Sequence, residues 1–82
     1  MGDPDEYVRQ TAVEYYGRLA GDEGTSRLVE AVSDRNSSVR FNALMALGDR
    51  LTSDLLPVVE SLLGDPDEYV RQTAVEYYGR LS

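Results

Sequence analysis

Cysteine, histidine and tryptophan are all absent from the 82 residues of this chain. The lack of cysteine removes disulfides and thiolate chemistry, and the lack of both cysteine and histidine removes the usual ligands of zinc. We therefore expect no cofactor and no metal site. A chain of this length has room for one small domain, so its stability must come from packing alone.

Basic residues are also scarce, with 8 Lys plus Arg against 15 Asp plus Glu and a formal net charge of −7. This sign is wrong for neutralising phosphates, so nucleic acid is not an expected partner. No apolar run approaches the roughly 20 residues of a membrane span, and the acidic first residues do not resemble a signal peptide. We expect no membrane partner and a cytoplasmic location.

An internal repeat organises the chain. The segment GDPDEYVRQTAVEYYGRL at residues 2–19 recurs unchanged at residues 64–81. A weaker third copy lies halfway between them, where Val39, Arg40 and Ala43 align with identical residues of both outer copies. The period is therefore 31 residues, and residues 1–82 form a single repeat domain.

Each period holds two predicted helices, which we name type B and type A. Type B follows an N-cap and carries apolar residues at helical spacing, with Gly48 as the stop in the middle copy. Type A follows Ser53 or Asp54 in its second copy, where Pro57 falls in the first turn. The predicted caps of type B are Asp5, Asn36 and Asp67. The order is B-A-B-A-B, with helices near 5–17, 23–33, 36–48, 54–63 and 67–80.

The motifs VRQTAVEYYGRL and VRFNALMALGDRL each have an Asp six positions before the Arg. They resemble the HEAT-like repeat of the phycobilisome-lyase type, and they are similar to engineered α-helical repeat proteins. The resemblance implies an all-α fold, a short α-solenoid of helical hairpins. It leaves the function open, because such repeats occur in scaffolds, regulatory subunits, bilin lyases and engineered binders.

The recurring arginines Arg9, Arg40 and Arg71 each stand six residues after an aspartate. The resemblance implies a ladder of Asp to Arg hydrogen bonds between successive repeats, made here by Asp34, Arg40, Asp65 and Arg71. A planar guanidinium opposite a carboxylate suits such a tie. The alternative, an anion site along the arginine row, requires unpaired guanidinium groups.

The middle type B helix carries two apolar residues, Phe41 and Met45, opposite its predicted core arc. The resemblance implies that this face lines the concave surface of the solenoid. A protein-binding patch would then have these two residues at its centre and a polar rim of Gln10, Glu14, Gln72 and Glu76. Equally, curvature could fold both side chains against neighbouring helices, or they could be exposed without consequence.

Carboxylates gather near the starts of the type B helices, where capping and the helix dipole already explain them. Their spacing does not match a calcium loop, and no nucleophile stands beside them. We therefore expect a chain that is not an enzyme. In the terminal helices, Tyr15 and Tyr77 share the apolar arc and are expected to pack.

Both ends of the chain carry the sequence of an internal repeat, where natural arrays have atypical capping repeats. This pattern predicts an engineered or excerpted repeat protein that associates with itself, as a dimer or end to end, by stacking or helix exchange. The residues expected at that contact are Tyr16, Leu19, Tyr78 and Leu81. The predicted function is protein–protein interaction and self-assembly; the alternative is a fragment of a bilin-lyase-like or other enzyme accessory subunit.

Overall fold

The computed structural model describes residues 5–82, which form five α-helices, two short 3-10 helices and no strand. The α-helices are α1 (Glu6–Arg18), α2 (Gly21–Ala31), α3 (Ser37–Leu47), α4 (Leu56–Ser61) and α5 (Glu68–Leu81). The 3-10 helices η1 (Gly48–Arg50) and η2 (Ser53–Leu55) join α3 to α4. The predicted all-α fold with five helices is confirmed.

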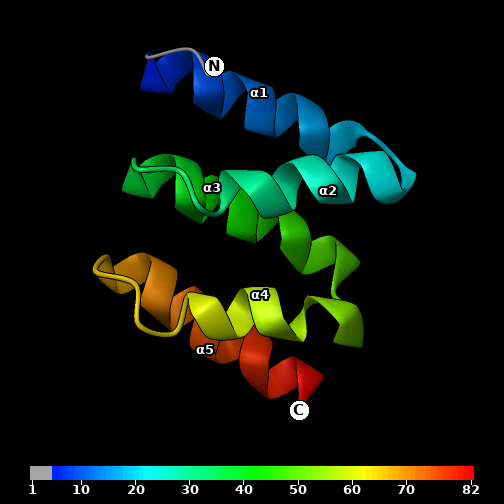
Figure 1. Cartoon of the computed structure of the whole chain (residues 1–82), viewed down its shortest axis with the longest axis vertical. Helices are drawn as coiled ribbons and strands as arrows, with labels where there is room; N and C mark the ends of the chain where they lie inside the picture. The colour runs from blue at the N-terminus through cyan, green and yellow to red at the C-terminus, as the bar shows by residue number, and fades with distance from the viewer. Residues whose placement is uncertain (1–4) are drawn as a thin grey trace.

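The helices form two layers, and within each layer they follow one another along the longest axis of the molecule (Figure 1). Helices α1, α3 and α5 are the type B helices of one layer, and α2 and α4 cover them from the other side. The extents of 34 × 29 × 17 Å agree with this arrangement, because two helices packed at roughly 8 to 10 Å fill the shortest dimension. Helices α1 and α5 therefore lie at opposite ends of the stack (Figure 1).

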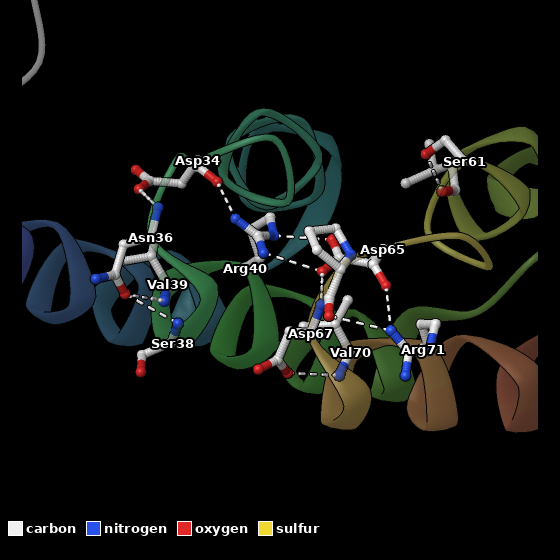
Figure 2. A network of polar contacts seen from close by, with 12 residues as sticks. Asp34, Asn36, Ser38, Val39, Arg40, Ser61, Asp65, Asp67, Val70 and Arg71 are labelled. Carbon is white, nitrogen blue, oxygen red and sulfur yellow. Dashed lines mark hydrogen bonds and ion pairs between the residues drawn. The ribbon is translucent and has the colours of Figure 1, made fainter.

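The type B helices begin at the three residues that the sequence predicts as caps. Asp5 accepts a hydrogen bond from the Tyr7 backbone N–H at 2.9 Å. In α3 the Asn36 side chain accepts from two backbone N–H groups, and in α5 the Asp67 side chain accepts from the Val70 N–H at 3.0 Å (Figure 2). These bonds satisfy donors that an isolated helix start would leave open.

The type A helices differ from the prediction at their starts. Helix α2 begins at Gly21, whose φ of 80° makes the tight turn after α1, and no side chain caps it. Helix α4 has Pro57 in its first turn as predicted, but its N-cap is Leu55 and not Ser53 or Asp54. Leu55 is buried in the core and belongs to the 3-10 turn η2, so the α-helix begins only after it, at Leu56.

Helix α3 ends at Leu47, and the predicted stop Gly48 is its C-cap residue. Its φ is −58°, and the chain continues directly into η1. A Cβ atom at Gly48 would lie 2.7 Å from Cζ of the Tyr77 ring, so the ring would have to shift to admit it. This close approach lies where α5 meets the end of α3, and Gly79 at the same repeat position has no atom within 4 Å of its Cβ site.

The core runs through both layers and is centred on α3, which supplies Val39, Ala43, Leu44 and Leu47 as buried residues. The other buried apolar residues are Val13, Leu28, Val32, Leu55, Val59, Leu62, Val70, Ala74 and Tyr77. Each helix contributes only a few of them, so each helix depends on its neighbours. In residues 5–82 we find no helix with the length and apolar character to cross a bilayer.

Candidate interaction surfaces

A row of alternating aspartate and arginine side chains joins successive repeats. Arg9 binds the Asp34 carboxylate through Nε and Nη2, at 2.7 and 3.0 Å. Arg40 binds the Asp65 carboxylate in the same two-pronged way, at 2.8 and 2.9 Å (Figure 2). Each carboxylate is thus held by the arginine 25 residues earlier in the chain. The expectation that Arg40 pairs with the Asp34 carboxylate, six residues before it, is wrong.

The six-residue spacing has a different use. Arg40 donates from Nη1 to the backbone carbonyl of Asp34 at 2.9 Å, and Arg71 donates likewise to that of Asp65 at 2.8 Å. Each aspartate also accepts from the backbone N–H two residues later, at 2.9 Å. One guanidinium therefore binds both the loop before α3 and the loop before α5, as Figure 2 shows for Arg40. Because both Arg9 and Arg40 hold carboxylates, the row does not offer an anion site there.

Burial of these two carboxylates disfavours their charged form, but hydrogen bonds and nearby positive charges favour the charged form more strongly. Burial raises the pKa of Asp34. The hydrogen bonds from Arg9 and the Asn36 N–H, together with nearby positive charge, lower this pKa by more than burial raises it. The pKa of Asp65 is likewise raised by burial and lowered more strongly by Arg40 and the Asp67 N–H. Both carboxyl groups therefore have a pKa below its ordinary value.

This depression predicts loss of stability in acid. An aspartate whose pKa is lower in the folded state stabilises the fold above the unfolded pKa of about 3.9, and that contribution disappears as the pH falls through the folded pKa. The free energy of unfolding should therefore fall as the pH drops below about 5. In urea titrations at each pH, Asp34→Asn should show a shallower decline than wild type. Parallel curves for the two proteins would contradict the assignment.

An open groove with a volume of about 480 Å³ crosses the starts of the three type B helices. Phe41 lies in it and meets Tyr69 edge to face, with ring centroids 6.5 Å apart. The remaining lining is polar and consists of Gln10, Ser37, Ser38, Asn42 and Asp67. The groove thus combines an aromatic pair with hydrogen-bonding side chains from α1, α3 and the start of α5.

The structure brings only part of the predicted concave patch together. Gln10 and Phe41 line the groove, and Phe41 is half-buried against the core. Met45 does not line the groove; it is exposed and accepts a hydrogen bond from the Tyr77 hydroxyl. Glu14 lines a separate hollow with Asn42 and Asp49. On α5, Gln72 bonds to Glu68 and Glu76 pairs with Arg80. Tyr69 belongs to the groove, although its position in the repeat did not single it out.

Arg50 makes a contact that the sequence patterns missed. Its guanidinium reaches back to the end of α1 and the start of α2, where it donates to the backbone carbonyls of Tyr16, Gly17, Leu19 and Gly21 and to the Thr25 hydroxyl. Carbonyls at a helix C-terminus have no partner within the helix, and a cation there also suits the helix dipole. Arg50 has no equivalent in the repeat alignment, so periodicity could not reveal it.

The two identical helices α1 and α5 bury different faces. Val70 and Tyr77 of α5 are 0% and 5% exposed, whereas their copies Val8 and Tyr15 in α1 are 47% and 58% exposed. The opposite holds for Val13, which is 3% exposed in α1 while its copy Val75 is 60% exposed in α5. The prediction that Tyr15 packs as Tyr77 does is therefore wrong. Two apolar surfaces remain uncovered, one at each end of the stack.

The residues predicted for self-association lie beside these surfaces and not at their centres. Tyr16, Tyr78 and Leu81 pack partly buried against the core, and Leu19 is half-buried at the end of α1. Tyr16 is held edge to face by Tyr15, whose ring centroid is 5.9 Å away. These residues are partly buried because each terminal helix packs on two other helices of its own chain along one side. The exposed apolar residues on the outer faces include Val8 and Tyr15 on α1 and Val75 on α5.

No group of three or more acidic side chains in residues 5–82 is placed to hold a metal ion. A family model described as HEAT repeats matches residues 1–79, which is nearly the whole chain. No curated protein matches the chain.

Proposed function

The chain belongs to the HEAT repeat family, whose members generally mediate protein–protein interactions and are typically non-catalytic, and we propose that it is a non-enzymatic protein-binding module. The observation that carries this proposal is the groove across the type B helices, with an aromatic pair in a polar surround. Aromatic side chains at the centre of a polar rim are the usual anatomy of a protein-binding patch.

The chemistry of the groove favours a particular kind of partner. Phe41 and Tyr69 offer apolar edges to an aliphatic or aromatic side chain, and the amides of Gln10 and Asn42 can bind a partner backbone. Asp67 contributes a carboxylate at the rim, and the net charge of the whole chain is −7. The proposed occupant is therefore a protein segment that presents one large apolar side chain next to arginine or lysine.

A random-peptide display library panned against the protein tests this proposal. Enriched peptides should carry an apolar residue beside a basic one, and Tyr69→Ser should weaken their binding at least about tenfold, or roughly 1.4 kcal/mol. The chain supplies a matched control, because Tyr7 is the sequence copy of Tyr69, is also exposed, and does not line the groove. Peptides that bind wild type, Tyr69→Ser and Tyr7→Ser equally would place the binding site elsewhere and refute the proposal.

We also propose that the chain associates with itself. The uncovered apolar residues at the two ends of the stack, Val8 and Tyr15 on α1 and Val75 on α5, support this proposal. Stacking repeats bury such surfaces against a neighbour, and a second copy offers one. Sedimentation velocity over a concentration series from micromolar to millimolar should show the mean mass rising. A constant monomer would remove self-association and leave the groove proposal untouched.

A further inference from the structure

The surface that α3 and α4 present to α5 fits one specific helix sequence. Helix α5 packs on both of these helices and buries Val70, Ala74 and Tyr77 completely or nearly so. The end of α3 is shaped for the tyrosine, since the Tyr77 hydroxyl lies 3.8 Å from the Met45 sulfur and any side chain on Gly48 would overlap the ring. We name this surface of α3 and α4 the α5 socket.

The same 18 residues occur again in α1 and the segment before it, with the matching apolar face uncovered. Val8 and Ala12, the copies of Val70 and Ala74, line an open hollow of about 310 Å³ at the outer side of α1 and α2. Tyr15, the copy of Tyr77, is also exposed. Helix α1 therefore presents copies of the three most deeply buried side chains of α5, while Tyr16, the copy of Tyr78, packs against its own core.

We propose that α1 of a second copy of this chain is the partner of the α5 socket, and that α5 is an intramolecular competitor for it. This inference deepens the self-association proposed above by naming the site and its occupant. A second copy is favoured over an unrelated partner because its α1 has the sequence of α5, with the Asp5 cap in place of Asp67 and Tyr15 in place of Tyr77.

The exchange also preserves the architecture of the stack. Helix α1 is followed by α2, so a docked α1 continues the alternation of type B and type A helices from one copy into the next. Val13 faces its own core, and Val8 and Tyr15 would face the socket, so the docked helix is buried on both sides. Two exposed apolar side chains of the separate molecule are thereby covered.

The balance between the two occupants is set by concentration. Both would place the same valine, alanine and tyrosine side chains in the socket, so the contact free energies of these three residues nearly cancel. Helix α5 has the advantage of a short connection from Ser61 to Glu68, which holds it at an effective concentration on the order of millimolar. Separate molecules at micromolar concentration therefore keep their own α5, and weakening α5 alone shifts the balance toward assembly.

Matched substitutions in the two identical helices test this inference. Val70→Glu should prevent α5 from occupying the socket, so the unchanged α1 of another copy can bind there. Light scattering at about 100 μM should then show species of at least twice the monomer mass, because α5 no longer competes for the socket. Val8→Glu should stay monomeric under the same conditions. The double variant Val8→Glu/Val70→Glu should also stay monomeric, because neither helix then fits the socket.

Two outcomes would overturn the inference. Assembly of the double variant equal to that of Val70→Glu would mean nonspecific association through the opened core, and a folded, monomeric Val70→Glu would mean that α1 does not enter. If circular dichroism shows Val70→Glu to be unfolded, the milder pair decides: Val70→Thr should lower the dissociation constant for self-association about tenfold and Val8→Thr should raise it. Equal constants for this pair would refute the exchange, even if wild type associates by another surface.

Discussion

Replacing Arg40 with Ala should lower the free energy of unfolding by about 3 to 5 kcal/mol, the usual cost of removing one partner of a buried ion pair. Arg40 supplies both bonds to the Asp65 carboxylate, which is buried between the repeats. Without the guanidinium this charge loses its main compensation, and the Asp34 carbonyl also loses a donor. Urea denaturation followed by circular dichroism at pH 7 measures the loss.

The chain provides a control at the same repeat position. Arg71 is exposed, and its guanidinium donates to the backbone carbonyls of Asp65 and Pro66. Arg71→Ala should therefore cost about 1 kcal/mol or less, the net value of an ordinary hydrogen bond. Equal losses for Arg40→Ala and Arg71→Ala would show that the Asp65 carboxylate does not depend on its arginine.

Gly24→Ala should destabilise the fold by about 3 kcal/mol, at the upper end of the cost of overpacking. A Cβ atom on Gly24 would lie 2.5 Å from the Leu19 carbonyl oxygen, 2.9 Å from that of Tyr16 and 2.8 Å from Arg50 Nη1. Two of these atoms belong to the backbone and cannot swing aside. The added methyl would push α2 away from the end of α1 and displace Arg50 from its carbonyl acceptors.

Thermal denaturation of Gly24→Ala and Gly64→Ala side by side measures this effect. A Cβ on Gly64 would meet no atom within 4 Å, so that substitution should be neutral or should stabilise by up to about 1 kcal/mol through the unfolded state. A Gly24→Ala protein that melts at the wild-type temperature would show that α2 can shift without loss, and that the contact of Arg50 is not tight.

Local chemistry made much of the fold predictable. Asp5, Asn36 and Asp67 cap helices wherever they stand before a helical apolar pattern, because the bond from cap to backbone needs only neighbouring residues. The starts of α2 and α4 were less predictable. Their positions depend on a left-handed Gly21 and on the burial of Leu55, which is a contact with distant residues.

The candidate sites were predictable only in part. Periodicity identified the aspartates and arginines of the row, but spacing alone cannot tell which carboxylate an arginine holds, since Arg40 reaches both Asp34 and Asp65. The sequence pattern indicated Phe41 and Gln10, which line the groove. Tyr69 lines the groove because α5 packs against α3, which the sequence did not show. Arg50 lies outside the repeat pattern, and only the folded chain shows what it binds.

By itself the sequence determined the helices, their period and their order, because apolar spacing and capping act within a few residues. It could not determine which face each helix buries. Helices α1 and α5 have one sequence and two burial patterns, with Val13 inside in the first and Val70 inside in the second. Burial depends on which neighbouring helices cover a face, and α1 is covered by α2 and α3 while α5 is covered by α3 and α4. Tertiary structure alone therefore decided which apolar surfaces remain open for a partner.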